Sequence, residues 1–223
     1  FANFNQTPHD VTVLTHEAGH AFQVFQSRNH MPDYVWPTFE ACEIHSMSME
    51  FLTWPWMNLF FKEDTDKFKY YHMTTAIKFL PYGVTVDEFQ HEVYENPELT
   101  PQERRMKWLE VERKYLPSRY YEEIPELDEG LFFYRQGHLF SVPFYYIDYT
   151  LAQVCAFQFW KKANENREKA WEEYLHLCKQ GGTKPFLELV KEANLENPFK
   201  DGTISNIVPE LKKYLDSVDA TKF

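Results

Sequence analysis

The stretch that most constrains the fold of this chain is Thr15-His16-Glu17-Ala18-Gly19-His20. It contains His-Glu-x-x-His, and two residues four positions apart on a helix lie on one face. The imidazoles of His16 and His20 are therefore expected side by side, as two ligands of a tetrahedral zinc ion. Glu17 lies one position further round, close enough to take a proton from a water on the metal. The competing interpretation is a solvated helix face that binds nothing.

The residues before the motif supply a strong helix start. Thr7 can cap the helix, Pro8 suits the first helical position, and Asp10 stands where a capping box places an acid. We therefore predict a helix from Pro8 to about Arg28, which contains the whole motif.

The composition favours helices packed on helices. Among 223 residues there are only 7 glycines, while aromatic residues make up 18%. Few glycines and many bulky side chains argue against a turn-rich β protein. No repeat, low-complexity segment or linker divides the chain. We expect an all-α fold in one helical domain over residues 1–223.

Hydrophobic spacing, caps and prolines place the other helices. Residues 118–135 are less regular, and a short strand or helix could form at 132–134. The predicted helices after the first are 38–60 with an interruption at Trp54-Pro55-Trp56, 67–79, 87–94, 101–117, 143–164, 169–179, 184–193 and 205–218.

Charge and cysteine usage restrict the partners and the compartment. A formal net charge of −11 argues against nucleic acid and anionic membranes as partners. The three cysteines, Cys42, Cys155 and Cys178, are widely spaced and fit reduced thiols of a cytoplasmic protein. No apolar run is long enough to span a membrane, and we see no signal peptide. Phe1-Ala2-Asn3-Phe4-Asn5 is interpreted as an edge strand cut from a longer protein.

A catalytic zinc ion needs a third protein ligand and one open position for water. The predicted helix 38–60 carries Glu40, Glu43 and Glu50 on one face, and spacing alone does not separate them as candidates. The acids that do not bind the metal are expected to accept the other ring N–H of a ligating histidine. For any one of them, the alternative is a solvated side chain.

Two segments together carry a family resemblance. His16-Glu17-Ala18-Gly19-His20, followed by Glu43-Ile44-His45-Ser46-Met47-Ser48-Met49-Glu50, resembles the zinc-binding region of the thimet oligopeptidase and oligoendopeptidase F family, especially its Pz-peptidase-like members. The resemblance covers essentially the whole chain, as the C-terminal catalytic part of longer enzymes. In the family the third ligand opens a Glu-x-x-Ser segment. The resemblance therefore favours Glu43, with Ser46, as the third ligand.

A second patch resembles the segment of this family that faces the zinc. It comprises Gly137-His138-Leu139 and Phe144-Tyr145-Tyr146-Ile147-Asp148-Tyr149. Tyr145 and Tyr149 are four positions apart on the predicted helix, so both hydroxyls could point one way. We interpret His138, Tyr145 and Tyr149 as oxyanion-stabilising residues and Tyr146 as core. His9, His30, His45, His72, His91 and His176 receive no metal role.

The resemblance implies a zinc-dependent endopeptidase that hydrolyses short oligopeptides. One zinc ion per chain would be held by His16, His20 and Glu43, with Glu17 as the general base. The enzymes of the family are more than twice as long, so an N-terminal part of the same enzyme is an expected partner that completes the cleft. The alternative is a non-catalytic domain that is stabilised by zinc or binds peptides.

Overall fold

The computed structural model of the chain describes residues 3–121 and 124–223, and every regular element in these ranges is helical. The all-α fold is therefore confirmed. The α-helices are α1 (Pro8–Ser27), α2 (Pro32–Val35), α3 (Phe39–Leu52), α4 (Asn58–Phe61), α5 (Thr65–Glu95), α6 (Pro101–Tyr115), α7 (Pro125–Asp128), α8 (His138–Ser141), α9 (Tyr146–Glu165), α10 (Arg167–Gln180), α11 (Phe186–Glu192) and α12 (Thr203–Ser217).

The start of α1 is the predicted capping box. The Asp10 carboxylate accepts the backbone N–H of Thr7 at 2.8 Å, and Pro8 occupies the first turn. α6 starts in the same way at Thr100, whose backbone N–H donates to Glu103. Of the proposed N-terminal strand, Phe1 and Ala2 lie outside the described residues, and residues 3–5 form no strand.

Two helices differ from the prediction, and the predicted interruption of a third is confirmed. The segment predicted as two helices is a single helix, α5, which continues through Pro81. The predicted helix 38–60 breaks at the expected proline, with α3 ending at Leu52 and a 3₁₀ turn at Trp54–Trp56 before α4. The helix predicted from residue 143 begins only at Tyr146, because Phe144 has a positive φ of 63° and donates its backbone N–H to Gln90. Residues Phe132–Arg135 form a 3₁₀ helix.

The chain divides into two compact units. The first unit runs up to Thr75 and resumes at Leu151, and the second unit is Ala76–Thr150. The expectation of a single domain over the whole chain stays a prediction. No helix within residues 3–121 and 124–223 is both long and apolar enough to cross a membrane.

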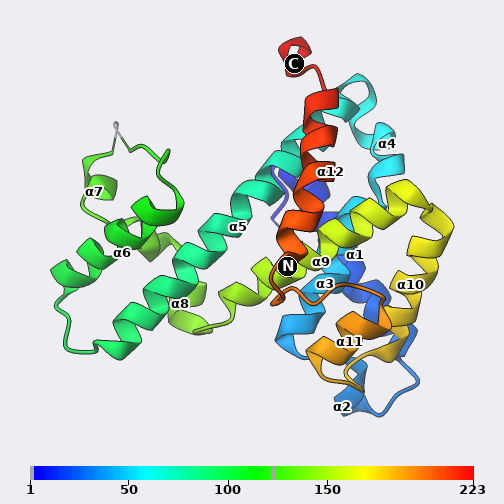
Figure 1. Cartoon of the computed structure of the whole chain (residues 1–223), viewed down its shortest axis with the longest axis horizontal. Helices are drawn as coiled ribbons and strands as arrows, with labels where there is room; N and C mark the ends of the chain where they lie inside the picture. Colours follow the sequence, from blue (N-terminus) through cyan, green and yellow to red (C-terminus); the bar gives the residue numbers. More distant parts are fainter. Residues whose placement is uncertain (1–2, 122–123) are drawn as a thin grey trace. The chain divides into compact units, whose positions relative to one another are not determined.

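In the first unit, α1 packs against α3 and α10 (Figure 1). α3 is buried on almost every side, and 11 of its 14 residues are buried. At Gly19 the two helices approach closely, since the α3 backbone at His45 and Ser46 occupies the space that a side chain would need. A polar side chain on a helix that is buried all round is costly unless it is hydrogen-bonded. The partners of the polar side chains of α3 therefore indicate what these side chains do.

The second unit has its own aromatic core. Val86 and Phe89 of α5 pack with Trp108 of α6 and Phe133, and Tyr146 lies against this cluster. Tyr146 is thus a core residue, as predicted.

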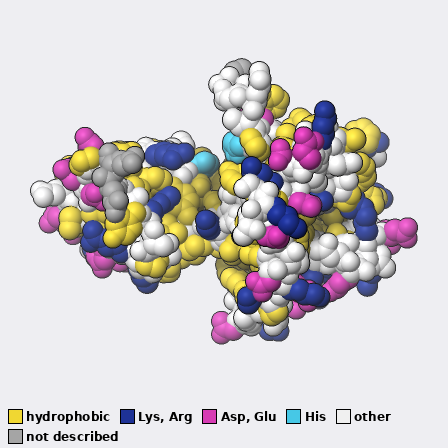
Figure 2. Space-filling model, turned by 90° about the horizontal axis from the view of Figure 1, so that it is seen from above, with side chains coloured by type: hydrophobic (Ala, Val, Ile, Leu, Met, Phe, Trp, Pro, Cys, Tyr) yellow, Lys and Arg dark blue, Asp and Glu magenta, His cyan; other side chains and the backbone are white. Residues whose placement is uncertain are grey.

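On the face drawn in Figure 2, acidic and basic side chains are interspersed among apolar ones. The exclusion of nucleic acid and membrane partners, which comes from the net charge, stays a prediction.

The three cysteines are buried, and burial raises the pKa of Cys155 and of Cys178 to about 12. Because only the thiolate reacts readily, we expect the native protein to react with Ellman's reagent at pH 8 much more slowly than the protein unfolded in guanidinium chloride, which should expose all three thiols. Rapid native labelling of any of them would contradict this burial. The cytoplasmic location stays a separate prediction.

Candidate metal centre

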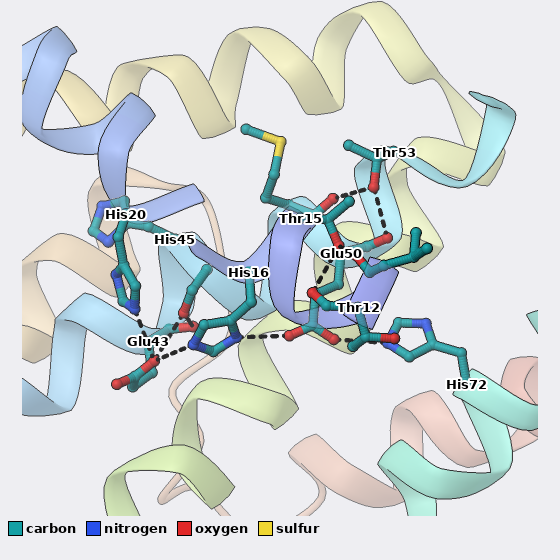
Figure 3. A network of polar contacts seen from close by, with 12 residues as sticks. Thr12, Thr15, His16, His20, Glu43, His45, Glu50, Thr53 and His72 are labelled. Atoms are coloured by element: carbon teal, nitrogen blue, oxygen red, sulfur yellow. Dashed lines mark hydrogen bonds and ion pairs between the residues drawn. The ribbon is translucent and has the colours of Figure 1, made fainter. Parts of the chain in front are cut away.

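The candidate metal centre is built around a buried carboxylate on α3. Glu43 is only 3% exposed, and a buried charge is strongly destabilising unless it is paired and hydrogen-bonded. Its Oε2 lies 3.2 Å from Nε2 of His16 and 3.3 Å from Nε2 of His20, and Ser46 Oγ donates to the same oxygen at 2.8 Å. Figure 3 shows both imidazoles of α1 pointing at Glu43. The structure thus brings the three predicted metal ligands together.

The donor set fits a zinc ion. Two atoms bound tetrahedrally at the usual Zn–N and Zn–O distances lie about 3.3 Å apart. The two imidazole nitrogens lie at this separation from Glu43 Oε2, and the ligand atoms of His16, His20 and Glu43 all lie within 4.8 Å of one another. The two rings are nearly perpendicular at 82°, so they do not stack on each other. Two imidazoles and one carboxylate are also the ligand types of catalytic zinc sites.

Glu50, a rival candidate for the third ligand, lies on the other side of His16. Its Oε1 is 2.7 Å from Nδ1 of His16. Burial lowers the pKa of His16, but hydrogen bonds to Glu43 and Glu50 outweigh this effect and raise the pKa to about 10. Burial raises the pKa of Glu50, whereas hydrogen bonds to His16 and His72 bring it below its usual value. Glu50 is thus a carboxylate that orients His16.

Two residues of this network, His72 and Trp54, are not predicted by the sequence. His72 of α5 contacts the second oxygen of Glu50, its Nε2 lying 2.7 Å from Oε2, and Trp54 Nε1 donates to His72 Nδ1 at 2.9 Å. His72 is 22 positions from Glu50, and no spacing rule links residues on two helices that meet only through the fold. The contact between the Trp54 indole and His72 is likewise visible only in the structure.

Glu17, the predicted general base, is exposed on α1 between the two histidines of the motif. An exposed carboxylate beside a candidate metal centre can exchange protons with water.

The structure also brings together the predicted second patch, which lies within the second unit. The ring of His138 lies 5.7 Å from that of Tyr149 and 6.1 Å from that of Tyr145, and the two tyrosine rings are 4.9 Å apart. Tyr145 precedes α9 instead of lying on it, so the helical spacing assumed for the pair is wrong although the rings are close. Gln136 Nε2 is 2.6 Å from His138 Nδ1, and Gln136 in turn accepts from Tyr82. This network helps to fix the orientation of the His138 ring.

A His-Glu-x-x-His helix that faces a carboxylate on a second helix defines the zinc-metallopeptidase class of site. The family model described as Peptidase family M3 matches residues 1–208. The chain belongs to this family.

Individual relatives agree with this assignment. The chain is 30% identical to an oligoendopeptidase F homolog of Borreliella burgdorferi, over 84% of this chain and 34% of that protein. The structure of Pz peptidase A with an inhibitor is 60% identical over 98% of this chain and 39% of that one, with a TM-score of 0.96. A structure assigned as an oligoendopeptidase F from Bacillus anthracis is 55% identical over 100% of this chain and 37% of its own, with a TM-score of 0.87. The chain thus spans well under half the length of each relative.

Proposed function

We propose that this chain is the catalytic part of a zinc-dependent endopeptidase that hydrolyses short oligopeptides. The observation that carries the proposal is the convergence of His16, His20 and Glu43, with an exposed Glu17 beside them. A bound zinc ion would polarise the scissile carbonyl and lower the pKa of a water molecule.

The side chains of the chain supply the remaining steps. Glu17 takes the proton of the attacking water and later delivers it to the leaving amine, which is general base and then general acid catalysis by one carboxylate. His16 and His20 each direct Nε2 to the metal position, and Ser46 holds the Glu43 oxygen that faces them. Glu50 keeps the His16 ring in place through Nδ1.

His138, Tyr145 and Tyr149 are proposed as donors that stabilise the tetrahedral oxyanion. A phenol and an imidazole can each donate a hydrogen bond to developing negative charge. The support for these roles is the resemblance together with the proximity of the three rings within the second unit.

The substrate class follows from family membership, and the share of each relative that the chain covers points to a further part of the enzyme. Peptidase family M3 and the names of the relatives indicate peptide substrates. We propose that an N-terminal part, corresponding to the uncovered length of the relatives, contributes to binding of the peptide.

Removal of the metal tests the proposal. Dialysis against 1,10-phenanthroline should stop cleavage of an internally quenched peptide, and one equivalent of zinc should restore it. Because zinc binds the folded site, we also expect it to raise the free energy of unfolding, by about 2.7 kcal/mol at a free zinc concentration 100 times the Kd. If the enzyme is assayed with its N-terminal part present, stabilisation by zinc without cleavage of the peptide would favour the non-catalytic alternative. A protein that binds no zinc would contradict the site itself.

A further inference from the structure

A buried line of polar contacts extends from His16 away from the candidate metal position. Glu50 bridges His16 and His72, with one carboxylate oxygen 2.7 Å from each ring (Figure 3). Beyond His72, the indole N–H of Trp54 donates to Nδ1 at 2.9 Å. His72 and Trp54 are 6% and 7% exposed, so bulk water does not replace these contacts.

The direction of each hydrogen bond in this line is fixed by its last member. An indole N–H is a donor only, so Nδ1 of His72 must present a lone pair to Trp54. A neutral imidazole with a lone pair on Nδ1 carries its proton on Nε2, which therefore donates to Glu50. Glu50 then accepts on both oxygens, from His72 on one side and from Nδ1–H of His16 on the other. With its proton on Nδ1, the His16 ring offers Nε2 to a metal.

Aromatic packing holds the His72 ring in this orientation. Phe68 stacks on it at 5.8 Å with the planes 7° apart, and Phe51 lies 4.7 Å away. Trp54 is held in turn by Trp160 of α9 and Tyr214 of α12, at 6.5 and 5.5 Å. A ring flip of His72 would place a C–H against Glu50 and leave a buried carboxylate oxygen unpaired, which is costly.

We propose that His72 and Trp54 are positioning residues for the metal centre, acting through Glu50 to fix the tautomer and ring orientation of His16. The inference rests on the proposed function, because it concerns the ligand set assumed there. It extends that function to residues on α5 and on the turn after α3 that contact no ligand atom of the metal. Outer partners of this kind commonly contribute tenfold or more to metal affinity.

Three variants separate hydrogen bonding from packing. His72→Leu removes the donor to Glu50 at similar volume. His72→Gln retains an amide N–H for Glu50 and an oxygen for Trp54. Phe68→Leu removes the ring stacked on His72 but no hydrogen bond of the line. Zinc Kd, measured by competition with a chromophoric chelator, should rise about 10- to 100-fold in His72→Leu and less than about threefold in the other two variants.

Each result of this comparison is decisive. Wild-type affinity in His72→Leu overturns the inference, and so do equal losses in all three variants, because these would assign the effect to packing. A wild-type protein that binds no zinc contradicts the proposed function and the inference together, whereas failure of the inference alone leaves wild-type zinc binding intact.

A second measurement does not depend on the folding of any variant. Long-range ¹H–¹⁵N correlation spectra of the metal-free wild-type protein should show His72 as the neutral tautomer protonated on Nε2. A proton on Nδ1 of His72 in the wild-type protein would overturn the inference.

Discussion

Replacing Glu17 with glutamine is expected to lower kcat for peptide cleavage by about 100- to 10,000-fold, the range that a general base supplies. Glutamine has nearly the same shape as glutamate but cannot accept the proton of the attacking water. Because Glu17 is exposed and is not among the three convergent ligands, zinc stoichiometry and Kd should stay close to those of the wild type. Cleavage of an internally quenched peptide and chelator competition measure the two quantities separately.

The matched control is Glu172→Gln, which removes one negative charge from an exposed position of α10. Its turnover and zinc affinity should both equal those of the wild type. Full turnover in Glu17→Gln would contradict the assignment of Glu17 as the general base. Loss of zinc together with turnover would instead make Glu17 part of the metal site.

The features that the sequence predicted correctly are local. The Thr7-Pro8-Asp10 start of α1 depends on contacts within four residues, and the helical spacing of His16 and His20 follows from one helix alone. Glu43 was one of three candidates until the family resemblance favoured it. The structure supports that choice physically, since Glu43 is the acid that lies against both histidines and Glu50 lies behind one of them.

The features that the sequence did not predict depend on tertiary contacts. Pro81 predicts a helix end in isolation, yet α5 continues through it as one helix, with Val86 and Phe89 beyond the proline packed in the aromatic core. The late start of α9 follows from the side chain of Gln90, which accepts the backbone N–H of Phe144 from another helix. His72 joins the metal centre only because α5 passes behind Glu50. These contacts join different helices, so they leave no regular spacing in the sequence from which they could be predicted.

Replacement of Gly19, within the His-Glu-x-x-His motif, is expected to have a second large effect, on zinc affinity. A Cβ at this position would lie 2.7 Å from both the His45 carbonyl oxygen and the Ser46 Cα, and 2.9 Å from Met49 Cβ. Two of these atoms are backbone of the buried α3 helix and cannot rotate away. Alanine would gain up to about 1 kcal/mol of helix propensity over glycine, but overpacking typically costs about 1–3 kcal/mol. The cost of overpacking is therefore expected to exceed the gain in helix propensity.

We therefore expect Gly19→Ala to push α1 away from α3 and to separate His16 and His20 from Glu43. Metal–ligand distances tolerate only about 0.2 Å, so zinc affinity should fall by at least about tenfold, with a lower thermal midpoint for the metal-free protein as well. Chelator competition and calorimetry measure these two effects. Gly137→Ala is the matched control, because nothing lies within 4 Å of a Cβ there and its backbone is helical at φ −55°. Since both variants add the same methyl group, equal zinc affinity in the two would show that close approach of α1 to α3 does not set the geometry of the metal centre.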